Sequence, residues 1–376
     1  MKIIDVEVFP LTQRQEDPTW TMALAKYPVI EGWIVAVHSE GRAGYGYAQS
    51  IPHMGSSRES LAGALALFRP RLIGRSALGI DPIMADLDAV ISGNNQAKAA
   101  IDCALHDLQA RVLGVPIHAL LGGAFRKSVP QIRILPIKSP AEMAKMARGL
   151  VAKGYTALKL KMHGHVEEDV ARVKLIRAAV GKKVMLTLDP NQSYLAKDAI
   201  VALRKMEPYD VHLVEQPVPA GDWKGLELVT KSVTQLVEAD ESAVTLQDVM
   251  SLAANRTVDA LSLKIPKLGG LRNAMLAAKI CHNAGIEYRV GATFGPRLMA
   301  AHGTQFAAAL PRLNLPCELA EFDHLLDDPF QGLEVKRGSI SVSDAPDSGI
   351  SIRKASMAAF TGRKVGDTTP LKQART

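Results

Sequence analysis

Acidic residues follow three short apolar runs in the middle of the chain. Asp189 ends the run LTLD, Glu215 ends LVE and Asp240 follows VEA, so the three acids lie about 25 residues apart, close to one strand–helix unit. Three converging carboxylates repel one another unless a cation neutralises them. Oxygen ligands of this kind favour a hard ion, so we predict a Mg²⁺ site, with Mn²⁺ as second choice. The alternative is a structural network in which each acid pairs with a neighbouring lysine.

Lysines stand in two similar runs on either side of these acids. Lys159 and Lys161 are two residues apart in TALKLKM, and Lys264 ends LSLK. Alternation along a strand sends Lys159 and Lys161 to the same face. Two ammonium groups in such an apolar run need acidic partners or a chemical task. The alternative interpretation is an ordinary solvated strand end.

The combination of a metal with lysines suggests proton transfer. A carboxylate substrate bound to the metal would place its α-carbon between Lys161 and Lys264. A lysine would remove the α-proton, and the metal would stabilise the enediolate that forms. Such a base has to be partly neutral near pH 7, and we expect the second cation, Lys159, to lower the pKa of Lys161.

The elements that position these residues alternate regularly between Gln131 and Phe322. Eight β-rich runs, the last being CELAEF, alternate with seven helical segments. This pattern predicts parallel strands in a closed (β/α)₈ barrel whose last helix is shortened or replaced. Barrel chemistry lies at the carboxyl ends of the strands, so Lys161 and Lys264 should face each other across the acids. An open doubly wound sheet is the alternative, but no glycine-rich phosphate loop follows the first strand.

The chain divides into three predicted parts. Residues 1–125 form an α+β unit with strands, a hairpin turn at Glu40-Gly41 and a clear amphipathic helix from about Gln96 to Leu113. Residues 126–325 form the barrel domain. Residues 326–376 return to the first unit and end in a basic tail from Thr361, which we interpret as a frayed or surface-packed end.

Composition limits the function classes. The net charge is +7, but the basic residues are dispersed, which argues against a nucleic-acid partner and mildly favours small anionic substrates. There is no apolar run of membrane-spanning length and no signal-peptide pattern, so we expect a cytoplasmic protein without a membrane partner. Cys103, Cys281 and Cys317 are widely spaced, as expected of reduced core residues.

Together these motifs resemble those of the enolase superfamily, in its muconate cycloisomerase-like (mandelate racemase/muconate lactonizing enzyme) family. KLK, DPNQ, EQP, ADES and LKIPKLGGL are similar to the family's motifs in order and spacing, and residues 94–123 resemble its capping-domain helix. The resemblance implies a modified (β/α)₈ barrel with an α+β capping domain completed by C-terminal segments; we also expect a homo-oligomer. The implied site consists of the metal ligands Asp189, Glu215 and Asp240, the acid/base lysines Lys161 and Lys264, the supporting Lys159, and Asn191 and Glu241 beside the ligands.

Departures from the family pattern narrow the substrate class. The histidine that mandelate racemase-like members carry near the end of strand seven is missing from EYRVGATFGPR. Dipeptide epimerases carry Asp-x-Asp at the end of strand eight to hold the substrate ammonium, whereas this chain reads Glu318-Leu319-Ala320, which counts against dipeptide epimerisation. Gly44-Tyr45-Gly46-Tyr47 replaces the frequent Gly-x-Gly-Glu. The candidate substrate contacts are Trp20, Tyr27, Met54, Phe294, Arg297 as a second anion clamp, and Glu318.

The leading hypothesis is a metal-dependent isomerase that abstracts the α-proton of a carboxylate substrate. Its product is either the epimer or, in a cycloisomerase reaction, the lactone or acid partner of the substrate. A dehydratase or an o-succinylbenzoate-synthase-like lyase is the alternative, because the same first half-reaction serves all of them. A non-catalytic metal-binding scaffold is the alternative from a different class.

Overall fold

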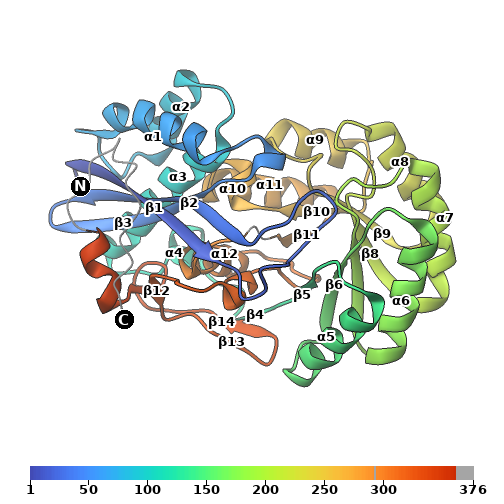
Figure 1. The fold of residues 1–376 in the computed structure, drawn as a ribbon. Coiled ribbons are helices and arrows are strands. Elements are labelled where there is room, and N and C mark those ends of the chain that lie inside the picture. The colour runs from blue at the N-terminus through green and yellow to red at the C-terminus, as the bar shows by residue number, and fades with distance from the viewer. Residues whose placement is uncertain (292–293, 361–376) are drawn as a thin grey trace.

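The computed structural model describes residues 1–291 and 294–360. Figure 1 shows two units side by side, with the N-terminal strands and helices on one side and a barrel surrounded by helices on the other. The first unit contains a three-stranded antiparallel sheet of β1 (Asp5–Arg14), β2 (Val29–Ser39) and β3 (Arg42–Gln49). The predicted hairpin turn is confirmed: Glu40 and Gly41 have φ values of 48° and 76°, as a tight turn between twisted strands requires.

Three helices cover this sheet: α1 (Arg58–Leu72), α2 (Ile80–Val90) and α3 (Asn95–Leu113). The predicted helix is therefore confirmed as α3, and it ends at Gly114, which has a left-handed φ of 69°. Helix α3 packs closely on β3, because a Cβ atom on Gly46 would lie only 1.9 Å from the carbonyl oxygen of Ala100. Glycine at position 46 thus allows the helix and sheet backbones to touch.

The second unit is built on a seven-stranded parallel sheet in the order β11-β10-β9-β8-β7-β6-β5, which follows the chain. Its strands are β5 (Arg133–Leu135), β6 (Ala157–Lys161), β7 (Met185–Asp189), β8 (Val211–Glu215), β9 (Leu236–Ala239), β10 (Ala260–Leu263) and β11 (Glu287–Val290). The intervening helices are α5 (Pro140–Ala152), α6 (Val166–Val180), α7 (Ala196–Met206), α8 (Trp223–Ser232), α9 (Leu246–Ala254), α10 (Ile265–Leu268), α11 (Leu271–Ala284) and, after β11, α12 (Arg297–Ala308). This strand–helix alternation confirms the predicted barrel-type fold.

The predicted eighth strand, CELAEF, is the exception. Within the described residues this run forms no strand, so the prediction of eight strands is wrong. Cys317 nevertheless exchanges backbone hydrogen bonds with Pro130 and Ile132, and Glu318 N–H donates to Val290 at 2.9 Å. The run therefore closes the ring between β11 and the chain before β5 through isolated bonds, and the short 3-10 helix η3 (Glu321–His324) follows it.

Short strands after the barrel return to the first unit. β14 (Ser339–Ser341) pairs with β13 (Val335–Lys336) and β4 (Ser128–Pro130), and β12 (Phe330–Gln331) pairs with β15 (Ser351–Ile352). Between β14 and β15, Asp347 bonds through its backbone to Val115 and Ile117 and pairs with Arg111 of α3 at 3.0 Å. The predicted domain limits at residues 125 and 325 stay predictions, and the basic tail lies outside the described residues.

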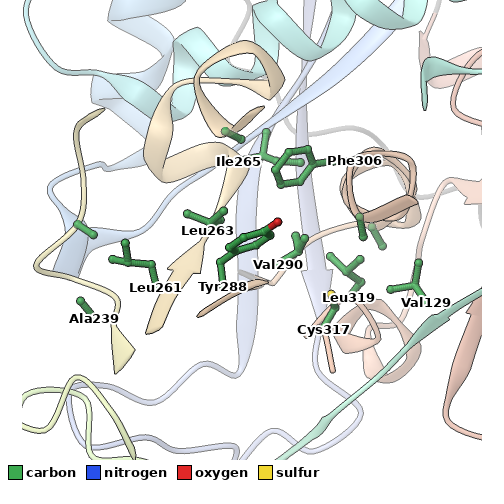
Figure 2. Packing of buried hydrophobic residues seen from close by; sticks show 14 of the residues in the cluster. Val129, Ala239, Leu261, Leu263, Ile265, Tyr288, Val290, Phe306, Cys317 and Leu319 are labelled. Carbon is green, nitrogen blue, oxygen red and sulfur yellow. The ribbon is translucent and has the colours of Figure 1, made fainter. Parts of the chain in front are cut away.

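A continuous apolar core lies between the strands of the barrel and the helices around them. Figure 2 shows Leu261 and Leu263 of β10, Tyr288 and Val290 of β11 and Phe306 of α12 gathered in this core. The three cysteines are buried and unpaired, as predicted. Of the helices that the structure describes, none is long and apolar enough to cross a membrane.

Helix α3 also braces the turn that follows β10. The carboxylate of Asp102 accepts a hydrogen bond from Leu271 N–H at 2.6 Å, and the Asn95 amide donates to Lys267 O at 2.8 Å. Gly270 has a φ of 133°, and a Cβ there would lie 2.3 Å from Cγ of Asp102. The first unit therefore supports the segment immediately after Lys264.

Candidate active site

Strand β6 carries its two lysines into the interior. All five residues of the strand are buried, and Lys159 and Lys161 are 1% and 5% exposed. Lys161 is in register with Asp189 of the neighbouring strand β7. Its Nζ lies 2.6 Å from Asp189 Oδ2 and 2.8 Å from Asn191 Oδ1. The parallel pairing of β6 and β7 thus supplies the acidic partner that a buried ammonium group needs.

Lys159 lies deeper and joins three carboxylates. Its Nζ is 2.6 Å from Glu215 and from Glu318, and 3.0 Å from Asp189. Burial opposes the charged form, but these three acids outweigh it and raise the pKa of Lys159 well above its ordinary value. Lys159 is therefore a permanent cation that holds the acids in place.

Lys264 stands at the opposite side of the acids, between β10 and α10. Its Nζ donates to Asp240 Oδ2, while Lys267 Nζ lies 2.8 Å from Asp240 Oδ1. Burial works against ionisation of Asp240, but the two lysines hold its pKa well below the ordinary range. Sequence reasoning missed Lys267, although its position one turn after Lys264 in LKIPKL places both side chains on one side of a short helix.

A second layer of charged side chains lies deeper in the barrel, and sequence reasoning missed Arg289 and Glu238 in it. The guanidinium of Arg289 on β11 donates to Glu238 of β9 at 2.9 Å and also to Glu215 and Glu318. Arg289 and Glu238 are 1% and 0% exposed. Alternation in QLVEAD and EYRVGA points both residues to the inner face, and that signal was available in the sequence.

Asp189, Glu215 and Asp240 are each 1% exposed or less and end or follow three consecutive strands. Each acid is paired with a lysine, and no group of three His, Cys, Asp or Glu residues within 1–291 and 294–360 is gathered closely enough to hold a metal. The arrangement therefore contains the lysine–acid pairs of the structural alternative. The metal-ligand role of these acids stays a prediction.

The donor set nevertheless fits a hard cation. Glu215 Oε1 and Glu241 Oε2 are buried without a hydrogen-bond partner among the described residues, and such an atom normally requires one. Burial and repulsion by Asp240 and Asp189 raise the pKa of Glu241 to about 7, while burial and repulsion by Glu318 and Asp189 raise that of Glu215. Two acids that are reluctant to ionise indicate a site short of positive charge. Asp189, Glu215 and Asp240 would hold the ion.

Asn191 and Glu241 lie near Asp189, and their role as partners of metal ligands stays a prediction. Asn191 N–H donates to Asp189 Oδ1 at 3.0 Å, and its side-chain amide is 3.4 Å from Glu241 Oε1. Asn191 has a φ of 45°, a left-handed conformation that asparagine tolerates better than most residues. This turn directs the amide toward both Lys161 and Glu241.

A cavity of about 530 Å³ lies above these groups, between the barrel and two loops of the first unit. Its floor is charged and its walls are mainly apolar and aromatic. Trp20 and Phe294 pack edge to face with ring centroids 4.7 Å apart. The lining residues include Lys159, Lys161, Asn191, Asp240, Glu241, Lys264 and Glu318 on the floor, and Trp20, Met22, Tyr27, Ile51, His53, Met54, Ile134, Phe294 and Glu321 around it.

Tyr27 and His53 join the two loops at the cavity. The Tyr27 hydroxyl lies 2.6 Å from His53 Nδ1. Burial and the nearby Lys264 cation lower the pKa of His53 to about 4, so the neutral ring accepts this hydrogen bond. The sequence analysis named Tyr27 and Met54, one on each loop, as candidate substrate contacts but did not single out His53.

Five of the six candidate substrate contacts, Arg297 being the exception, line this cavity. The Arg297 guanidinium is bonded to Asp328 at 3.0 Å and lies over the ring of Phe322 at 4.9 Å. The arrangement therefore gives no support to Arg297 as an anion clamp. Glu318, although it lines the cavity, is already bonded to Lys159 and Arg289.

Glu321 is the acid that sequence reasoning overlooked at this end of the barrel. It is 2% exposed and lines the cavity. His324 Nε2 lies 2.9 Å from one of its oxygens and Arg133 3.6 Å from the other, yet neither oxygen accepts a well-aligned hydrogen bond from a described residue. Burial disfavours its charge, but Arg133 and His324 lower its pKa. Glu321 is thus a buried carboxylate at the edge of the cavity, next to Arg133 and His324.

Comparisons with known proteins cover nearly the whole chain. Residues 4–122 match the model of the mandelate racemase/muconate lactonizing enzyme N-terminal domain, and residues 142–356 match the enolase C-terminal domain-like model. The hydrophobic dipeptide epimerase of Enterococcus faecalis is 38% identical over 277 residues, 73% of this chain and 77% of that protein. The L-Ala-D/L-Glu epimerase of Bacillus subtilis is 32% identical over 359 residues, 93% of this chain and 97% of that protein.

Solved structures agree with these matches. The E. faecalis V583 dipeptide epimerase complexed with Mg and the dipeptide L-Leu-L-Tyr superimposes with a TM-score of 0.90 at 32% identity, covering 93% of this chain and 100% of that chain. Chloromuconate cycloisomerases are also among the relatives.

Proposed function

The chain belongs to the mandelate racemase/muconate lactonizing enzyme family of the enolase superfamily, and from this premise we propose that it epimerises the α-carbon of a carboxylate substrate. The similar proteins include an epimerase, a racemase and cycloisomerases, which supports an isomerase, either a racemase or epimerase or a cycloisomerase. Epimerisation needs two proton-transfer groups on opposite sides of one carbon. The choice between these reactions therefore depends on how the lysines are placed.

The observation that carries the proposal is the position of Lys161 and Lys264 in one cavity. They come from β6 and from the end of β10, with the three acid-bearing strands β7, β8 and β9 between them. In the proposed reaction one lysine removes the α-proton and the other returns a proton to the opposite face. Lys159 remains charged beneath them and holds Asp189 and Glu215.

A divalent cation, which we propose to be Mg²⁺, would be held by Asp189, Glu215 and Asp240. When bound, it supplies positive charge against the negative charge that builds on the substrate carboxylate as the α-proton leaves. For the acids to reach such an ion, Lys161 and Lys264 must release them. That exchange of partners would free both lysine Nζ atoms for the substrate.

The walls of the cavity support a substrate with a cationic group, of which a dipeptide with an apolar side chain is the simplest. Glu321 lines the cavity, and we assign its carboxylate as the partner of a substrate ammonium group. Within the described lining, the cationic side chains are Lys159, Lys161 and Lys264, so a second substrate carboxylate has no further cation to bind. These features favour an amino-acid derivative over a dicarboxylate such as muconate.

The sequence Glu318-Leu319-Ala320 no longer counts against a dipeptide substrate. The doubt about dipeptides rested on Glu318, which in the structure bonds to Lys159 and Arg289 and is occupied by them. Glu321, three residues later, lines the cavity, and neither of its carboxylate oxygens accepts a well-aligned hydrogen bond from a described residue. The dipeptide epimerases among the relatives support the same substrate class.

The test is exchange of the substrate α-hydrogen in D₂O. Wild-type protein with Mg²⁺ is incubated with a panel of dipeptides, N-acylated amino acids and muconates, and deuterium incorporation is followed by NMR. We expect exchange and inversion with one or more dipeptides, both lost with EDTA and restored by Mg²⁺. The Lys161→Ala and Lys264→Ala variants should each abolish inversion, and only the double variant should abolish all exchange.

Lys231→Ala serves as the control, because Lys231 is exposed and pairs with Glu227 on the surface of α8. Dependence of exchange on one lysine alone would instead indicate cycloisomerisation or elimination. Turnover of muconates without dipeptide exchange would contradict the proposal.

A further inference from the structure

Gly291 lies directly beside Lys264, across the boundary between β10 and β11. Leu263 is in register with Val290, so the next residues on the two strands, Lys264 and Gly291, stand opposite each other. Gly291 N–H donates to Leu263 O at 3.2 Å, which fixes the glycine against the base of the lysine. Its backbone therefore forms part of the surface on which the Lys264 side chain lies.

The space that a side chain at position 291 would need is already filled. A Cβ atom there would lie 2.1 Å from Ser262 Oγ, 3.0 Å from Lys264 Cε and 3.1 Å from Lys264 Cγ. Contacts this short force a neighbour to move. Ser262 is fully buried and its hydroxyl has no hydrogen-bond partner among the described residues. Two points of contact along one stem mean that Lys264 cannot avoid the added atom by rotating only its tip.

We propose that Gly291 is a positioning residue, and that the missing side chain at this position sets the path by which Lys264 reaches Asp240 and the cavity. The proposal rests on the proposed function of Lys264 as one of two acid/base groups. Lys161 comes from β6, and four strands of the sheet lie between β6 and β11; the atoms nearest to a Cβ at position 291 belong to Ser262 and Lys264. A side chain at 291 should therefore damage proton transfer on one face of the substrate and spare the other.

This asymmetry separates positioning from general damage. A misfolded or loosely packed barrel would slow exchange of both substrate isomers, whereas a displaced Lys264 slows only the isomer whose α-proton faces it. A displacement of about 1 Å can cost on the order of a hundredfold in rate. We expect Gly291→Ala to slow exchange of that isomer by about tenfold to a hundredfold and exchange of the other isomer by less than about threefold.

Gly303→Ala is the matched control. Gly303 and Gly291 line the same second cavity, of about 370 Å³, behind the proposed site. A Cβ at Gly303 would lie 2.4 Å from Leu319 Cδ2, which is the end of a flexible side chain, and would not meet Lys264. Both variants therefore add one methyl group to the wall of one cavity, and only the first should be selective for one isomer.

A second variant removes the other clash. In the double variant Gly291→Ala/Ser262→Ala the contact with Ser262 Oγ is gone, while those with Lys264 Cε and Cγ remain. Ser262→Ala alone should have little effect on exchange, because this hydroxyl has no partner to lose. If exchange of the Lys264-dependent isomer is still slow in the double variant, the effect is due to the contact with the Lys264 side chain and not to the contact with Ser262.

The experiment measures initial α-hydrogen exchange in D₂O, with Mg²⁺, separately for L-Leu-L-Tyr and L-Leu-D-Tyr. Lys264→Ala identifies the isomer that depends on Lys264. The proposal is supported if Gly291→Ala slows exchange of that isomer selectively. In Gly303→Ala the exchange rates of the two isomers should change equally or not at all. The proposal is overturned if Gly291→Ala slows exchange of both isomers equally or slows neither.

A crystal structure of Gly291→Ala gives a result that does not depend on activity. We expect Lys264 Nζ to lie outside hydrogen-bond distance of Asp240 Oδ2 while Lys161 keeps its contact with Asp189. An unmoved Lys264 overturns the inference even if exchange is impaired. If the wild-type protein exchanges neither dipeptide, the proposed substrate class fails, and the position of Lys264 in this crystal structure alone decides about Gly291.

Discussion

Replacing Glu321 by glutamine should selectively weaken turnover of substrates with a free ammonium group. Glu321 is 2% exposed, lines the cavity and leaves its carboxylate oxygens without a well-aligned donor. A substrate ammonium placed there would form a charge-assisted hydrogen bond in a largely dry site. Glutamine keeps the size and one oxygen but removes the charge.

The magnitude follows from the type of bond that is lost. A hydrogen bond to a charged group contributes about 1.5–3 kcal/mol, and every 1.4 kcal/mol corresponds to about tenfold in an equilibrium or rate constant. We therefore expect kcat/KM for L-Leu-L-Tyr to fall by roughly tenfold to a hundredfold. For the N-acetylated dipeptide, which has no ammonium group, the fall should be less than about threefold.

The assay compares kcat/KM for the two substrates in wild type, Glu321→Gln and Glu334→Gln. Glu334 pairs with Lys336 on the surface and controls for the loss of one negative charge. Thermal unfolding of each variant tests for damage to the fold, because Glu321 also lies near Arg133 and His324. Equal losses for the free and acetylated dipeptides would refute the assignment of Glu321 to the ammonium group.

Three further predictions concern the metal, acid stability and packing. Glu215→Gln should weaken Mg²⁺ binding by at least about tenfold, measured by isothermal titration calorimetry, because one of three anionic ligands is lost; unchanged binding would exclude Glu215 as a ligand. Burial lowers the pKa of His302 to about 4, from an ordinary 6.5, so the unfolded chain binds more protons than the folded one between these values and stability falls with falling pH in that window. His302→Gln should remove about 3 kcal/mol of this loss, seen as a flatter dependence of the free energy of unfolding on pH from 6.5 to 4; an unchanged slope would contradict it. Gly46→Ala should destabilise the fold by about 1–3 kcal/mol, because its Cβ would meet the backbone of α3. Gly63→Ala in α1, whose Cβ would meet no atom within 4 Å, should instead stabilise the fold by about 0.5–1 kcal/mol. Urea denaturation measures both free energies of unfolding, and equal effects of the two variants would argue against the contact between Gly46 and α3.

Local sequence was sufficient to predict which residues lie at the strand ends. A short apolar run that ends in Asp, Glu or Lys specifies its own place in a parallel barrel, because the period of the strand and the length of the following helix are local properties. Asp189, Lys161 and Lys264 could therefore be placed on one end of the barrel without a structure. Strand order makes β6 and β7 neighbours, but the pairing of Lys161 with Asp189 also requires the register that the structure shows.

Other features depended on contacts between distant segments. Arg297 had the right charge for a clamp, but it bonds to Asp328, 31 residues away, and nothing near Arg297 in the sequence indicates that partner. Glu318 and Glu321 are three residues apart, but Glu318 bonds to Lys159 and Arg289, which are 159 and 29 residues away from it in the sequence. The same applies to CELAEF, whose neighbours on both sides offer it isolated bonds rather than a ladder.

The brace between α3 and the turn after β10 has a consequence for the order in which the protein is made. Asp102 precedes Leu271, its partner, by 169 residues, so the helix leaves the ribosome long before the turn that it supports. Domains generally fold as units during synthesis, the N-terminal one first. The first unit can therefore be in place when the β10 segment emerges and can receive Gly270 and Leu271 as they arrive. A barrel expressed without residues 1–125 would lack this partner, and adding the missing fragment in trans should restore the turn beside Lys264 only if the fragment has folded first.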